Sequence, residues 1–195
     1  MTYHPRTKRI AASAALALGI VAIIGAHQST RARAELTGDR VTGTVEIREI
    51  DVASTSTSDP KWSTGLKGLE ITVNVIGLTP GAHGIHFHEI GKCDAPEFTS
   101  AGGHFDPGPH GMTDPDVNHP YHMGDLPNLV ADVNGRARLK ATTTRATLSP
   151  GPLSLFDADG AAVIVHADPD QGTTGAEKSG VSGGPRIACG VVVKR

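Results

Sequence analysis

The chain has 195 residues, 19% of them charged, and a formal net charge of −2 at pH 7. Without the first 34 residues, 13 basic residues stand against all 20 acidic ones, a net charge of −7. This balance argues against a nucleic-acid-binding protein, which is usually basic, and no basic run indicates an anionic membrane surface.

The N-terminal segment has the three parts of a secretory signal peptide. Arg6, Lys8 and Arg9 are basic, residues 10–26 are an unbroken apolar and small run, and Ala32-Arg33-Ala34 fits a small-x-small cleavage site. An uncleaved membrane anchor is the alternative, although this run of 17 residues is short for a span of about 20. We therefore expect residues 1–34 to be a signal peptide. Residues 35–195 would form one exported domain, periplasmic or extracellular, without stable membrane association once the signal is cleaved.

The exported part is predicted to be all-β. The chain contains 24 Gly and 13 Pro, which punctuate it at short intervals, and no segment shows a long 3.6-residue period. After a lead-in at Glu35–Asp39, apolar alternation and β-branched runs predict strands at Val41–Ile50, Leu69–Ile76, Val130–Thr144, Ala161–His166 and Ile187–Val193. Asn134-Gly135 breaks the third of these and is the strongest short hairpin signal. The pattern favours a β-sandwich or barrel.

The run Gly84–His88 carries metal-ligand chemistry. Side chains on a strand alternate between faces, so His86 and His88 point to one side while Ile85 and Phe87 point to the other. Two converging imidazoles are half of a transition-metal site. All eight histidines beyond the signal segment lie between residues 83 and 166, which is more clustered than a solvated surface would produce.

Two long stretches, Gly91–Asn128 and Ala167–Pro185, fit no strand. Structureless loops of this length in a compact domain are usually functional or disordered. The first contains four histidines and five aspartates, so we favour a functional loop.

Cys93 and Cys189 are the only cysteines. In an oxidising compartment a disulfide is the default interpretation. A pair of thiolate metal ligands is the alternative, which the abundance of nearby histidines and carboxylates makes less favoured.

These residues resemble the copper/zinc superoxide dismutase family, in its bacterial, secreted type. The matching strings occur in family order and are Gly81–Glu89, Ala101–Pro107, His122–Pro127, Val163–Ala167 and Pro185–Val191. The resemblance implies a Greek-key β-sandwich or flattened barrel with two long functional loops. Together with the strand pattern it covers residues 38–195.

The resemblance also implies a copper and a zinc that share one imidazole. Copper would be held by His86, His88, His104 and His166, and zinc by His104, His122, Asp125 and one further histidine. Because imidazole has two ring nitrogens, His104 can bind both metals at once.

The further zinc ligand is less well defined, because the chain departs from the common spacing here. Both His110 and His119 lie between His104 and His122. A tetrahedral site takes only one of them. We favour His110, which best matches the family string, and keep His119 as the alternative.

Three other residues have family counterparts. Asp170 stands where the family places a carboxylate between a copper histidine and a zinc histidine, although it also fits an ordinary loop aspartate. Arg186 matches the active-site arginine, for which a surface ion pair is the alternative. His83 matches a structural histidine, and we assign it no metal.

The expected function is disproportionation of superoxide to oxygen and hydrogen peroxide, with copper and zinc as cofactors and with Arg186 and His104 as catalytic residues. The alternative is a dismutase-like protein that binds copper or zinc without turnover. Superoxide is the expected partner and nucleic acid is not. Relatives pair through different faces or stay monomeric, so a homodimer is one option.

Overall fold

Alternating apolar and polar residues build one large antiparallel sheet in this computed structural model, which describes residues 1, 30–52, 66–108, 115–117, 119 and 122–195. The strands are β1 (Arg31–Thr37), β2 (Thr42–Asp51), β3 (Lys67–Ile76), β4 (Gly81–His83), β5 (Ile85–His88), β6 (Leu129–Ala131), β7 (Arg136–Thr143), β8 (Ala162–His166), β9 (Arg186–Val191) and β10 (Val193–Lys194). Within the described ranges, one short 3-10 turn (η2, Thr99–Ala101) is the only helical element.

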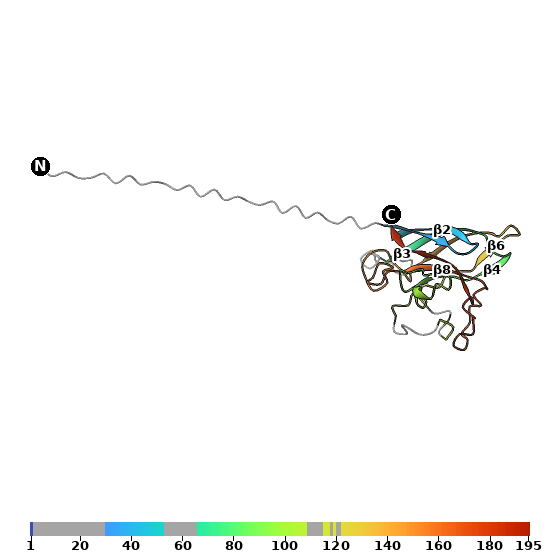
Figure 1. Cartoon of the computed structure of the whole chain (residues 1–195). Coiled ribbons are helices and arrows are strands. Elements are labelled where there is room, and N and C mark those ends of the chain that lie inside the picture. The colour runs from blue at the N-terminus through green and yellow to red at the C-terminus, as the bar shows by residue number, and fades with distance from the viewer. Residues whose placement is uncertain (2–29, 53–65, 109–114, 118, 120–121) are drawn as a thin grey trace, which may run out of the picture.

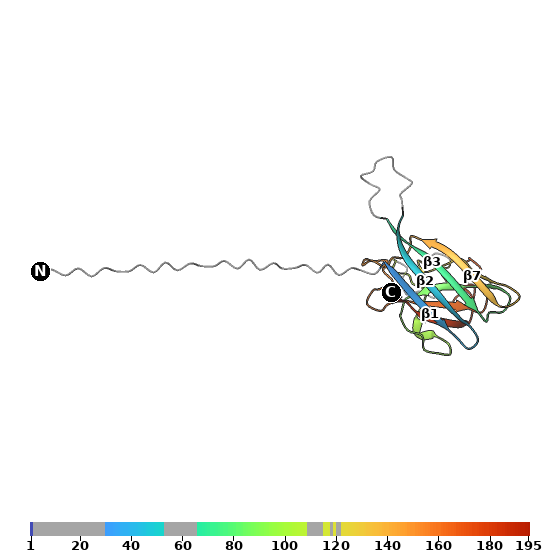
Figure 2. The ribbon, with the colours of Figure 1, turned by 90° about the horizontal axis from the view of Figure 1, so that it is seen from above.

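The sheet closes almost completely on itself. Its strand order is β4-β6-β7-β3-β2-β1-β9-β8-β5, with β10 added beside β1. The two edge strands, β4 and β5, are separated in sequence only by Gly84, so the chain passes directly from one edge to the other. Figures 1 and 2 show the resulting flattened barrel, with β1, β2, β3 and β7 side by side. The all-β prediction is confirmed.

The barrel interior is filled by one face of each long strand. Val45 on β2 lies opposite Val73 on β3, which lies opposite Leu139 on β7. Val45 and Val73 are fully buried, as are Ile85 and Phe87 on β5. Each buried aliphatic side chain stabilises the fold by about 1.5–3 kcal/mol. The inward residues of β5 thus hold its backbone rigidly against the core.

The predicted strands from residue 41 onward are confirmed, with boundaries that differ by at most two residues. The Asn134-Gly135 hairpin joins β6 to β7. Gly135 has a φ of 71°, and a Cβ there would lie 2.3 Å from the carbonyl oxygen of Leu78. Asp132 Oδ1 accepts the N–H groups of Asn134 and Arg136. The turn therefore needs glycine both for its backbone angle and for space.

The start of the domain differs from the sequence interpretation. Residues 31–37, interpreted as a cleavage site followed by a lead-in, form β1, which pairs with β2 over seven residues. Ala32 and Ala34 are fully buried. Alanine is a weak strand former, and an Ala-x-Ala pair satisfies a cleavage motif and a tightly packed strand face equally well. The folded domain therefore begins ahead of residue 35.

Residues 2–29, which contain the basic start and the apolar run, lie outside the described residues. Among those that are described, no helix is long and apolar enough to cross a membrane. The C-terminal residue lies beside the start of β1, where its N–H donates to the carbonyl oxygen of Arg31 at 3.1 Å (Figure 1).

Candidate metal centre

Four histidines from three parts of the chain converge at one side of the barrel. His86 and His88 lie on β5, and His166 ends β8, the strand that pairs with β5. His104 joins them through an isolated bridge to His88. One ring nitrogen of each lies within 4.8 Å of the others, and all four residues are buried. We call these residues the four-histidine group.

A second group shares His104 with the first. It consists of His104, His119, His122 and Asp125, whose ligand atoms also lie within 4.8 Å of one another. All four are buried. We call it the mixed group. One imidazole therefore lies between two clusters of potential ligands.

Although His104 Nδ1 lies 2.7 Å from Asp125 Oδ1, seven other ring nitrogens of the two groups have no hydrogen-bond partner within the described residues. They are His86 Nδ1, His88 Nε2, His104 Nε2, His119 Nδ1, His122 Nδ1, His122 Nε2 and His166 Nε2. Buried polar atoms are normally satisfied, and unpaired ones call for an explanation such as an ion. Four imidazoles suit copper or zinc, and three imidazoles with one carboxylate suit a closed zinc site.

The opposite nitrogens of these rings are held by the surrounding structure. His88 Nδ1 lies 3.1 Å from the carbonyl oxygen of Gly102, and His166 Nδ1 lies 2.9 Å from that of Gly184. Such a contact fixes the orientation of an imidazole and leaves its other nitrogen free to bind a metal.

The carboxylate of Asp170 contacts one histidine of each group. Its Oδ2 lies 2.9 Å from His86 Nε2, and its Oδ1 lies 2.5 Å from His119 Nε2. The side chain of Asn128 holds the backbone of Asp170 by donating to its carbonyl oxygen and accepting its N–H. One carboxylate thus orients a histidine of each group.

Burial keeps the imidazoles of His88, His104 and His166 neutral. Removal from water lowers the pKa of His88 and His166 well below the usual value, and nearby imidazoles lower it further. Burial and His86 lower the pKa of His104 to about 3, against the opposing effect of Asp125. Since a metal binds the deprotonated nitrogen, these rings are ready to bind at neutral pH.

The carboxylates of the centre are ionised. Burial alone would raise the pKa of Asp125, but hydrogen bonds with His104 and His122 outweigh it and keep the pKa well below the usual range. Burial alone would likewise raise the pKa of Asp170, but hydrogen bonds with His119 and His86 outweigh it and keep that pKa low. The mixed group therefore includes a negative ligand.

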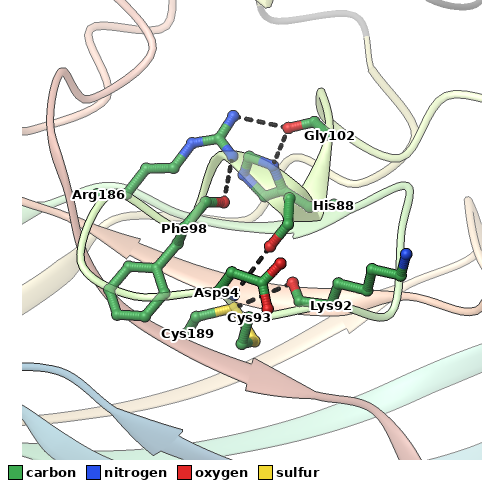
Figure 3. Close-up of a disulfide and its surroundings, with 9 residues drawn as sticks. His88, Lys92, Cys93, Asp94, Phe98, Gly102, Arg186 and Cys189 are labelled. Carbon is green, nitrogen blue, oxygen red and sulfur yellow. Dashed lines mark hydrogen bonds between the residues drawn. A yellow bond between two sulfur atoms is a disulfide. The ribbon is translucent and has the colours of Figure 1, made fainter.

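Arg186 lies at the mouth of the four-histidine group. Its Nη1 donates to the carbonyl oxygen of Phe98 at 2.8 Å, and its Nη2 to that of Gly102 at 2.6 Å. Gly102 also contacts His88, so one carbonyl links the guanidinium to the metal-facing ring (Figure 3). Burial lowers the pKa of Arg186, but a guanidinium stays charged at neutral pH.

A cavity of about 260 Å³ opens onto this mouth. Its lining includes His88, His104, His166, Lys178 and Arg186. Two cations, three imidazoles and Asp116, whose carboxylate accepts the N–H groups of Gly180 and Ser182, line a space large enough for a small anion.

A disulfide between Cys93 and Cys189 ties the first long loop to β9, with a Cα–Cα distance of 5.6 Å (Figure 3). Phe98 lies in the same loop and packs with Cys189 in a small apolar cluster. The disulfide therefore anchors the loop that carries two contacts of Arg186, the carbonyls of Phe98 and Gly102.

His83 belongs to neither group. Its Nδ1 lies 2.9 Å from the carbonyl oxygen of His166, and its Nε2 lies 2.9 Å from the carbonyl oxygen of Thr79 and 3.3 Å from the Thr79 hydroxyl. His110 lies outside the described residues, and His119 is the histidine that joins the mixed group. Sequence reasoning missed the carbonyls of Gly102 and Gly184, because a backbone acceptor leaves no residue signature. It also missed Asn128, whose side chain contacts the backbone of Asp170.

Comparison with known proteins gives a consistent result. The family described as copper/zinc superoxide dismutase (SODC) matches residues 41–192. Superoxide dismutase [Cu-Zn] of Caulobacter vibrioides is 40% identical over 131 residues, which are 64% of this chain and 71% of the relative. The enzyme of the same name from Deinococcus radiodurans is 35% identical over 158 residues, 76% of this chain and 83% of the relative.

Solved structures show the same similarity. A superoxide dismutase-like protein from Bacillus subtilis superposes with a TM-score of 0.62 at 29% identity, covering 83% of this chain and 97% of the other. The clock protein EA4 superposes with a TM-score of 0.66 at 25% identity, covering 86% and 96%.

Proposed function

Since this chain belongs to the copper/zinc superoxide dismutase family, we propose that it converts two superoxide anions and two protons to oxygen and hydrogen peroxide. The observation that carries the proposal is His104, whose imidazole lies between two buried ligand groups with unpaired nitrogens.

We assign copper to the four-histidine group through His86 Nδ1, His88 Nε2, His104 Nε2 and His166 Nε2. We assign zinc to the mixed group through His104 Nδ1, His119 Nδ1, His122 Nδ1 and the Asp125 carboxylate. His119 replaces His110 in this assignment because its ring lies in the group and its Nε2 is held by Asp170.

Copper, when bound, supplies the one-electron exchange that oxidises one superoxide and reduces the next. The protein supplies the rest. Arg186 attracts and orients the anion in the cavity beside His88, and its two backbone contacts hold the guanidinium in place. When it is not bound to copper, His104 Nε2 would hold and deliver one proton, and water supplies the other.

We also propose that the protein is exported, as its disulfide and its apolar N-terminal run favour. Cleavage after Ala34 would remove half of β1, including the buried Ala32 and Ala34. We therefore place the cleavage ahead of Thr30. N-terminal sequencing of the exported protein tests this, and a mature chain that starts at Glu35 contradicts it.

The function is tested by loading the purified protein with copper and zinc, measuring both metals, and following superoxide decay by pulse radiolysis. We expect equal amounts of the two metals and a rate constant approaching the diffusion limit, about 10⁸–10⁹ M⁻¹s⁻¹. A fully loaded protein that does not accelerate superoxide decay would instead be a metal-binding protein without turnover.

A further inference from the structure

Arg145 contacts the mixed group from outside both long loops. It follows β7, which pairs with β3 over eight residues and belongs to the barrel wall. Its Nη1 donates to the carbonyl oxygen of His122, and its Nη2 to that of Asp125, each at 3.1 Å. Both carbonyls belong to buried residues that contribute ligand atoms.

The two carbonyls mark the ends of one tight turn. Within it, the N–H of Asp125 donates to the carbonyl oxygen of His122 at 3.4 Å, and the N–H of His122 donates to Asp125 Oδ2 at 3.2 Å. This turn supplies two of the four ligand residues of the mixed group. Because a guanidinium is a rigid planar fork, one side chain fixes both ends of the turn relative to β7.

The positive charge of Arg145 has an effect on zinc binding that opposes the effect of its two hydrogen bonds. A guanidinium close to the mixed group repels a divalent cation and, by charge alone, weakens zinc binding. Neutralising Arg145 would therefore tighten zinc binding if charge were its only effect. It would weaken zinc binding if the two carbonyl contacts place the ligands. The two effects have opposite signs, so one measurement separates them.

We propose that Arg145 is a positioning residue for zinc, holding the turn from His122 to Asp125 in the geometry that the metal requires. This inference rests on the proposed assignment of zinc to the mixed group. It adds to the site a residue that touches no metal and lies about 20 positions from the ligands that it orients.

The test compares Arg145→Gln and Arg145→Lys with the unchanged protein and with Lys140→Gln. Lys140 lies on β7 and is exposed, so this control removes one positive charge from the strand that precedes Arg145 without touching the turn. Zinc affinity is measured by competition with a chromophoric chelator. Cobalt(II) is then bound in place of zinc, and its visible absorption reports ligand geometry independently of enzyme activity.

We expect Arg145→Gln to bind zinc roughly 10–100-fold more weakly, the usual effect of losing a residue that orients metal ligands, and to change the cobalt spectrum. Arg145→Lys keeps the charge but loses the fork, so its affinity should fall by less. Lys140→Gln should match the unchanged protein. Copper binding to the four-histidine group, measured on the same samples, should be retained.

Zinc binding by Arg145→Gln that equals or exceeds that of the unchanged protein overturns the inference. If circular dichroism shows that Arg145→Gln does not fold, the Arg145→Lys variant decides the question. Zinc affinity and a cobalt spectrum of Arg145→Lys that both equal those of the unchanged protein then overturn the inference. Failure of the unchanged protein itself to bind zinc would reject the proposed function, and the inference with it. Normal zinc binding by every variant rejects the inference alone.

Discussion

Individual histidines of the centre divide their two ring nitrogens between metal and protein. His88 and His166 each present Nε2 to the four-histidine group while Nδ1 contacts a backbone carbonyl. His83 lies three residues from His86, and each of its ring nitrogens lies against a backbone carbonyl oxygen, so neither is available to a metal. The number of free nitrogens, rather than residue type alone, therefore separates ligand histidines from structural ones.

Replacing His88 by Gln should remove copper and dismutation while leaving zinc in place. Glutamine fills much of the buried space but supplies no imidazole nitrogen. The loss of copper affinity should exceed the roughly 10–100-fold typical of losing a supporting contact. Copper and zinc content after loading and dialysis checks this. Retention of copper and of most of the activity would show that His88 is not a copper ligand.

His119→Gln should weaken zinc binding more than His110→Gln does. The ring of His119 lies in the mixed group and contacts Asp170 on its far side. Zinc affinities of the two variants, measured by chelator competition, decide between them. The opposite order would return the ligand role to His110.

Arg186→Ile should lower the rate constant for superoxide without removing metal, because it removes the cation beside the cavity. The rate of the unchanged protein should fall as salt rises, since screening over about 10 Å at 0.1 M weakens attraction of the anion. The salt dependence should be smaller in the Ile variant. Pulse radiolysis at several ionic strengths, on samples matched for copper, measures both. Equal rates and equal slopes would remove Arg186 from the mechanism.

The short strand β5 was one of the strands most easily predicted from the sequence, and β1 was the least easily predicted. The two-residue spacing of His86 and His88 implied a strand, and the alternating apolar residues Ile85 and Phe87 implied a buried inner face. In β1, the inward residues Ala32 and Ala34 are too small to produce a strong apolar alternation. The close packing of β1 against β9 depends on Gly190, where a Cβ would lie 2.6 Å from the carbonyl oxygen of Glu35 and 3.2 Å from the Cβ of Ala34. Such a contact between distant residues is not visible in a local pattern.

The loop after β7 is anchored to β2 by a buried carboxylate. Glu49 accepts the N–H groups of Leu148 and Ser149 at 2.6 Å and also the Ser149 hydroxyl. Burial alone would raise the pKa of Glu49, but these hydrogen bonds outweigh it, so the pKa lies below 4.5. The ionised form therefore contributes stability that is present above about pH 4.5 and is lost as the pH falls through the folded-state pKa.

Glu49→Gln should accordingly lower the free energy of unfolding of the metal-free protein by about 1–3 kcal/mol at neutral pH. The difference from the unchanged protein should shrink on acidification, because the native carboxylate is then protonated as well. Urea unfolding at neutral and acidic pH measures it. Glu70→Gln, on the exposed side of β3, is the control and should show little effect. A difference that stays constant with pH would contradict the role of ionised Glu49.

For the whole molecule, the sequence was sufficient to predict the barrel class, the disulfide and the four-histidine group. It was not sufficient to choose between His110 and His119, since the choice depends on how a loop of nearly 40 residues folds over Asp170.

The net charge of the molecule opposes its proposed substrate. Residues 30–195, with 15 basic and 20 acidic side chains, carry a net charge of −5 and repel an anion, so local attraction by Arg186 and Lys178 at the cavity must exceed the global field.

The central claim is that one imidazole, that of His104, joins a copper site to a zinc site. The most direct test is a crystal structure of the protein loaded with both metals, with anomalous diffraction recorded at the copper and zinc absorption edges. We expect a copper peak at Nε2 of His104, among His86, His88 and His166, and a zinc peak at Nδ1, among His119, His122 and Asp125. A single metal peak, or two peaks that do not share His104, would contradict the account.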